Sequence, residues 1–166
     1  MKDFLFYTLI AVLLVLFQIF VFNQIHLFGF GCIFIYVLFI ISAPLSIKPA
    51  PLVVMGFLLG LSVDIFSNNY GTNAAATTLV AYIRPRTIRL FFSNSKLENS
   101  VKFFSDFTPD YYKYLITIIA IHHFTVFMLE AFTFSLILLV LLKTAISTVS
   151  TAIFIFFIQS LFFKKK

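Results

Sequence analysis

Apolar residues occur along this chain in six long runs, and each run is separated from the next by a short polar or turn-forming stretch. A helix of about 20 apolar residues crosses the hydrocarbon core of a bilayer. The sequence therefore predicts six transmembrane helices, at residues 4–22, 27–47, 51–66, 72–92, 113–132 and 134–163. We expect one integral-membrane domain, residues 1–166, with an all-α fold in which the helices form a bundle.

Composition supports this interpretation. The chain is 61% hydrophobic and only 11% charged, whereas a soluble domain has about 25% charged residues. The continuous apolar runs also disfavour a transmembrane barrel, which shows alternating apolar and polar positions. The net charge of +6 is interpreted as a determinant of membrane topology and a contact for anionic lipid. We expect no nucleic-acid partner.

The basic residues predict the orientation of the six helices. Lysine and arginine occur at every second connection: Lys2, Lys48, Arg84, Arg86, Arg89, Lys96, Lys102, Lys113 and Lys164 to Lys166. Cytoplasmic loops carry an excess of such residues. Both termini and the connection 84–113 are therefore expected in the cytoplasm.

The fourth apolar run is less regular than the others. Arg84, Arg86 and Arg89 lie in its second half, together with Pro85. Either the helix is short and the membrane thins around it, or the arginines extend to the inner interface. The following stretch RTIRLFFSNSKLENSVKFF is compatible with an interfacial helix and equally with a loop.

Gly56, Gly60 and Asp64 are spaced by four residues and lie on one face of the third predicted helix. Glycines at this spacing let two helices approach closely in lipid. Small residues, Ala74 and Ala75 among them, open the fourth helix, so we expect the third and fourth helices to pack as an antiparallel pair. Packing against another helix would shelter Asp64 from lipid; the alternative is a hydrated carboxylate near the outer interface.

Glu130 and Lys143 are further isolated charges within apolar runs. A lysine in lipid requires a carboxylate or water. We expect Lys143 to form an intramembrane ion pair with Asp64 or Glu130; the alternative is an extended lysine that reaches the outer surface.

The sequence does not favour an enzyme. His122 and His123 lie in the middle of the fifth helix, where a core histidine that bonds across helices is commoner than a catalytic one. Neither an H-E-x-x-H pattern nor a G-x-S-x-G pattern occurs, and Cys32 has no C-x-x-C partner. We therefore expect no catalytic residue, no metal and no cofactor.

The stretch GFLLGLSVDIFSNNYGTNAAATTLVAYI resembles the signature region of the rod shape-determining protein MreD family. The residues that carry the resemblance are Gly56, Gly60, Asp64, Gly71, Ala74 to Ala76 and Tyr82. It implies a non-enzymatic scaffold of the cell-elongation complex in the bacterial plasma membrane, with a fold similar to the substrate-binding subunits of energy-coupling-factor transporters. The implied partners are MreC and, through the complex, MreB, RodA and its transpeptidase, which build lateral peptidoglycan.

The alternative function is a substrate-binding membrane subunit of an energy-coupling-factor vitamin transporter. Such subunits often carry Ala-x-x-x-Ala on an early helix for docking to the coupling subunit. The first predicted helix has a single alanine, Ala11, which favours the scaffold over the transporter subunit.

Overall fold

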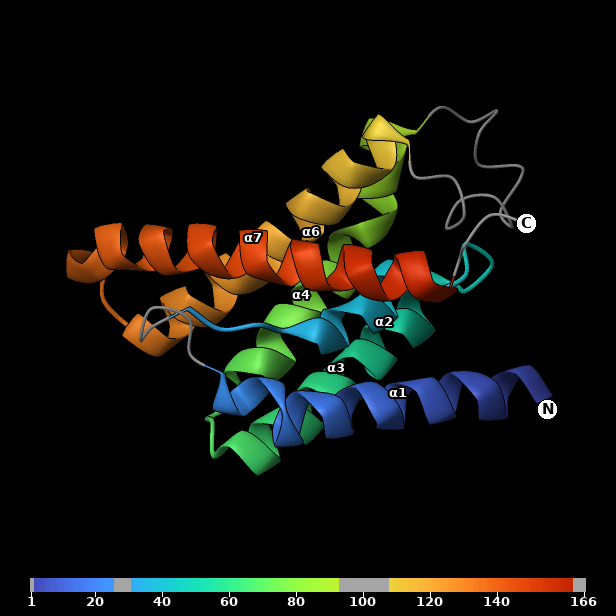
Figure 1. Ribbon diagram of the computed structural model, residues 1–166, viewed down its shortest axis with the longest axis horizontal. Helices are drawn as coiled ribbons and strands as arrows, with labels where there is room; N and C mark the ends of the chain where they lie inside the picture. Colours follow the sequence, from blue (N-terminus) through green and yellow to red (C-terminus); the bar gives the residue numbers. More distant parts are fainter. Residues whose placement is uncertain (1, 26–30, 93–107, 163–166) are drawn as a thin grey trace.

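The computed structural model describes residues 2–25, 31–92 and 108–162, and within these ranges the protein is helical with no strand (Figure 1). The α-helices are α1 (Lys2–Phe20), α2 (Leu38–Ile41), α3 (Pro49–Ser67), α4 (Thr72–Phe91), α6 (Pro109–Ala131) and α7 (Ile137–Phe162). Short 3-10 turns are η1 (Phe22–Gln24), η2 (Ile35–Val37) and η3 (Phe134–Leu136).

Local sequence explains where the helices begin and end. Pro49 and Pro109 occupy the first turns of α3 and α6, where a missing N–H has no cost. The Thr108 hydroxyl accepts a hydrogen bond from the Tyr111 N–H and caps α6. Asn68 and Phe132 end α3 and α6 in the left-handed conformation, with φ of 54° and 50°.

Within the described residues, four helices are long and apolar enough to cross a membrane: Phe6–Gln24, Pro49–Ser67, Pro109–Ala131 and Phe134–Ser160. Large apolar side chains are exposed along α1, α3 and α7, as expected of surfaces that contact lipid. The chain is therefore an all-helical membrane protein, as predicted. Five of the predicted helices correspond to α1, α3, α4, α6 and α7 with small shifts at their ends.

α4 is the most polar of the long helices and the most central one. It continues through Pro85 to Phe91, and it packs against α3 on one side and α6 on the other. The stretch RTIRLFFSNSKLENSVKFF covers residues 86–104. Its first six residues belong to α4, and its part from residue 93 onward, interfacial helix or loop, lies outside the described residues.

The prediction of a second continuous helix at residues 27–47 is wrong for the described part of that range. Residues 31–34 belong to no helix, and only η2 and the four-residue α2 follow. In Figure 1 this segment runs between α1 and α7. All residues from Ile33 to Ile41 are buried, so their apolar character reflects the interior of the protein rather than a lipid-facing helix. Non-helical backbone is tolerated at membrane depth where protein surrounds it.

Candidate functional site

α3 and α4 meet at a seam of small residues, which we call the glycine seam: Gly56, Gly60, Asn73, Ala74, Thr77 and Ala81. A Cβ at Gly60 would lie 2.5 Å from the Asn73 carbonyl oxygen and 2.6 Å from the Ala74 Cα. A Cβ at Gly56 would lie 3.1 Å from the Thr77 carbonyl oxygen. The two backbones are therefore in direct contact at Gly60, and a side chain there would require the helices to separate.

Asp64 lies one turn beyond Gly60 and caps the N-terminus of α4. It is 1% exposed. Its Oδ1 accepts hydrogen bonds from the Asn73 N–H (3.1 Å) and the Asn73 Nδ2 (2.9 Å), and its Oδ2 accepts one from the Ala74 N–H (2.7 Å). α4 has no capping side chain of its own, because Gly71 with φ of 88° precedes it. The carboxylate thus satisfies unpaired N–H groups and the positive end of the helix dipole.

Hydrogen bonds continue from this cap into the core. The Tyr36 hydroxyl donates to the Asn73 Oδ1 (2.9 Å), and the same hydroxyl lies 2.8 Å from the His122 Nε2. A tyrosine has one proton to donate, so His122 must donate from Nε2. Asp64, Asn73, Tyr36 and His122 therefore form a continuous buried chain across α3, α4, η2 and α6, in which the His122 Nδ1 has no partner.

Side chains of α1 and α7 hold the segment 31–35, which comprises the non-helical residues 31–34 and the start of η2. The Ser147 hydroxyl accepts from the Cys32 N–H (2.9 Å) and the Thr151 hydroxyl from the Phe34 N–H (3.2 Å). Gln18 accepts from the Ile35 N–H (2.8 Å) and donates to the Ile33 carbonyl oxygen (2.9 Å). These bonds replace the backbone hydrogen bonds that a helix would make within this segment, because backbone groups buried away from water must find partners.

His123 supports one of these contacts. Its Nδ1 lies 2.7 Å from the Ile119 carbonyl oxygen and must donate to it, because a carbonyl only accepts. The His123 Nε2 then accepts from the Thr151 hydroxyl at 3.1 Å. His122 therefore carries its proton on Nε2 and His123 carries its proton on Nδ1. His122 bonds the Tyr36 hydroxyl of η2, and His123 orients the Thr151 hydroxyl that accepts from the Phe34 N–H.

Arg84 and Tyr114 hold the chain where α2 ends, at residues 41–43. Arg84 is 3% exposed, donates to the Ala43 carbonyl oxygen through Nη2, and lies 3.2 Å from the Tyr114 hydroxyl through Nε. Tyr114 donates in turn to the Ile41 carbonyl oxygen at 3.3 Å. Arg84 is thus a structural residue of the protein interior, and its guanidinium is engaged by protein groups.

Arg86 and Arg89 differ from Arg84, since both are exposed. The Arg86 guanidinium lies 5.0 Å from the centre of the exposed Tyr82 ring. Ala75 is also exposed. Of the residues that carry the family resemblance, Gly56, Gly60, Asp64 and Ala74 come together at the glycine seam, whereas Ala75 and Tyr82 lie away from it.

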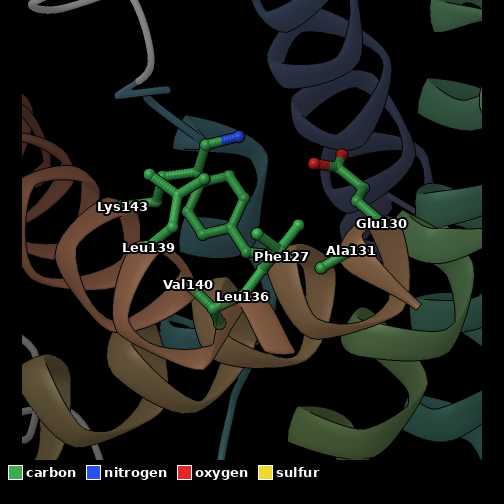
Figure 2. A pocket seen from close by; sticks show the side chains of 7 residues that line it. All are labelled: Phe127, Glu130, Ala131, Leu136, Leu139, Val140 and Lys143. Carbon is green, nitrogen blue, oxygen red and sulfur yellow. The ribbon is translucent and has the colours of Figure 1, made fainter. Parts of the chain in front are cut away.

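The expected intramembrane ion pair is not formed. Asp64 is engaged by α4, and no contact within 4.0 Å joins Lys143 to Asp64 or Glu130, all three of which the structure describes. Lys143 instead lies over the Phe127 ring, with Nζ 5.7 Å from its centre. Figure 2 shows Lys143 extending over this ring toward the side on which the Glu130 carboxylate lies, at a hollow of about 250 Å³ between α6 and α7.

Several residues of the polar core were not singled out from the sequence: Gln18, Tyr36, Asn73, Ser147 and Thr151. Gln18, Tyr36, Ser147 and Thr151 lie within predicted apolar runs, which is the signal that would have identified them. Asn73 follows directly on the polar turn between the third and fourth predicted helices and carries no such signal. Within the described ranges, no group of three or more His, Cys, Asp or Glu side chains is arranged to hold a metal ion. The arrangement fixes side-chain orientations and satisfies backbone groups.

Comparisons of the chain with protein-family models, with curated proteins and with solved structures identify no match.

Proposed function

We propose that this protein is a non-enzymatic membrane scaffold, whose intramembrane polar groups hold its own fold. The observation that carries the proposal is the engagement of the buried Asp64 carboxylate by three N–H donors of Asn73 and Ala74 at the start of α4. A carboxylate so engaged is a fixed structural element. A catalytic or transport carboxylate would instead face substrate or water.

The proposed setting is the cell-elongation complex of the bacterial plasma membrane, with MreC as direct partner and MreB, RodA and its transpeptidase in the same assembly. Support comes from the resemblance to the MreD family. Its spaced residues Gly56, Gly60 and Asp64 all have a defined structural task here, which is the contact of α3 with the start of α4. A chance occurrence of these three residues at this spacing would not require them to act together in one contact between helices.

The proposed surface for MreC lies at the end of the bundle that carries the α3–α4 and α6–α7 turns. In Figure 1 both turns lie at the left. Aromatic side chains protrude from them: Tyr70 is 102% exposed, Phe132 89% and Phe134 81%. Aromatic residues are enriched both at membrane interfaces and in protein–protein contacts. The glycine seam and the Asp64 cap would fix the turn between α3 and α4 in position.

In the proposed topology the chain crosses the membrane six times with both termini in the cytoplasm. α1, α3, α4, α6 and α7 supply five crossings, and the buried segment with η2 and α2 supplies the remaining one. The distribution of lysine and arginine supports this orientation. Reporter fusions after residue 24, within 93–107 and after residue 132 test it, and an external location of the 93–107 fusion would contradict it.

A transporter subunit is the second candidate, favoured by the hollow that carries both Glu130 and Lys143. Affinity purification of the tagged full chain from native membranes, followed by mass spectrometry of the bound proteins, separates the two functions. The scaffold predicts recovery of MreC and RodA. Recovery of a coupling transmembrane subunit with its ATPases would overturn it in favour of transport.

A further inference from the structure

The hollow between the end of α6 and the start of α7 has an apolar floor and two opposite charges. Phe127 forms the floor, and Leu136 and Leu139 form part of the wall. Lys143 and Glu130 contribute an ammonium and a carboxylate that are not joined to each other by a contact within 4.0 Å. Figure 2 shows the Lys143 side chain at the Phe127 ring, with the Glu130 carboxylate set apart from it on the side toward which Lys143 extends. Such a site matches a ligand that carries both an anionic and a cationic group.

The size and surroundings of the hollow favour a lipid. Its volume of about 250 Å³ is below the roughly 300–1,000 Å³ of typical small-molecule sites. It adjoins the exposed apolar surface of α7, where Leu138 is 79% exposed and Leu142 49%. An amphiphile can place its headgroup between the two charges and lay its acyl chains along these leucines.

We propose that this hollow binds the headgroup of phosphatidylethanolamine. The Lys143 ammonium would donate to the lipid phosphate, and the lipid ammonium would donate to the Glu130 carboxylate. A charge-assisted hydrogen bond from N–H to a carboxylate is strong. A choline headgroup has no N–H and cannot make that bond, while a phosphatidylglycerol headgroup brings no cation to Glu130. The site thus selects ethanolamine over both.

The experiment measures lipid retention by the purified full-length protein. The wild type is equilibrated in mixed micelles with equal amounts of phosphatidylethanolamine, phosphatidylcholine and phosphatidylglycerol, and the bound lipid is quantified by native mass spectrometry. We expect phosphatidylethanolamine to exceed phosphatidylcholine by about tenfold, the effect of one hydrogen bond between charged groups. Equal retention of the two lipids, or a preference for phosphatidylglycerol, would overturn the proposal.

Variants assign the two roles separately. Glu130→Gln removes the acceptor charge and is expected to abolish the preference for ethanolamine over choline while phosphatidylcholine retention stays unchanged. Lys143→Met is expected to lower retention of both lipids, and Lys143→Arg to preserve it. Lys113→Met, at the opposite end of α6, is the matched control and should behave as the wild type. An unchanged ethanolamine preference in Glu130→Gln, or equal retention in Lys143→Met and the wild type, would contradict the assignment.

Discussion

The Asp64 carboxylate of α3 accepts a hydrogen bond of 2.7 Å from the backbone N–H of Ala74 in α4, so one helix caps the next across the glycine seam. Helix caps are usually supplied by the residue that precedes the helix. Here Gly71 occupies that position, and its positive φ turns the chain sharply enough to bring the start of α4 against α3. The turn, the seam and the cap therefore depend on one another.

Replacing Asp64 tests the cap. In Asp64→Asn one carboxylate oxygen becomes an NH₂ group that faces N–H donors, so at least one bond is lost in the interior. We expect a loss of roughly 1–3 kcal/mol of stability, measured as a lower unfolding temperature in detergent by circular dichroism. Glu130→Gln, which touches no cap, serves as the control and should unfold near the wild-type temperature. A wild-type unfolding temperature for Asp64→Asn would indicate a hydrated carboxylate.

Replacing the seam glycines tests the close contact of α3 and α4. Gly60→Ala places a Cβ against backbone atoms that cannot move independently, and we expect roughly 1–3 kcal/mol of destabilisation. Gly56→Ala should destabilise the protein less. Its Cβ would lie 3.1 Å from the Thr77 carbonyl oxygen, whereas the Cβ of Gly60→Ala would lie 2.5 Å from the Asn73 carbonyl oxygen. Thermal unfolding of both variants checks the order. The contact would be disproved by equal stability of Gly60→Ala and the wild type.

The long helices could be predicted from the sequence, whereas the second segment could not. Apolar runs separated by polar or turn-forming stretches identify helices because the backbone hydrogen bonds of a helix are local, although the start of α6 at Pro109 lies four residues before the predicted one. The segment 31–41 has an equally apolar sequence, but its backbone partners Ser147 and Thr151 are more than 100 positions away along the chain. Hydropathy does not show such partners.

The candidate site was likewise predicted in part. The common face of Gly56, Gly60 and Asp64 followed from helical periodicity, and the structure places all three against α4. Lys143 lies within 4.0 Å of neither Asp64 nor Glu130, and counting charges does not reveal that N–H groups of Asn73 and Ala74 engage Asp64. The role of Asn73 also escaped prediction, since its side-chain partners Tyr36 and Asp64 come from two other segments.

The single cysteine provides a probe of the buried segment. In Ser147→Ala the Cys32 N–H loses its acceptor, and the cost of roughly 1–3 kcal/mol favours local opening. We expect the Cys32 thiol to react about tenfold faster with a membrane-permeable maleimide. Ser150→Ala, whose hydroxyl bonds only the Ile146 carbonyl of its own helix, is the matched control. Equal labelling rates in the two variants would show that Ser147 does not hold the segment.

The two adjacent histidines are expected to be neutral and to carry opposite tautomers. The hydrogen-bond network requires a proton on Nε2 of His122 and on Nδ1 of His123. Solid-state NMR of the ¹⁵N-histidine-labelled protein in lipid distinguishes the two forms by their nitrogen shifts, and His122→Gln and His123→Gln assign the signals. The same tautomer at both positions would contradict the network.

We propose that the glycine seam holds in place the surface at the α3–α4 and α6–α7 turns to which partner membrane proteins bind. The most direct test compares Gly60→Leu with Ala75→Leu, which adds the same side chain at an exposed position of α4. Both variants are purified from native membranes, and co-purified MreC is quantified alongside the monodisperse protein recovered. We expect loss of MreC from Gly60→Leu and wild-type amounts with Ala75→Leu. Equal MreC recovery with the two variants would contradict it.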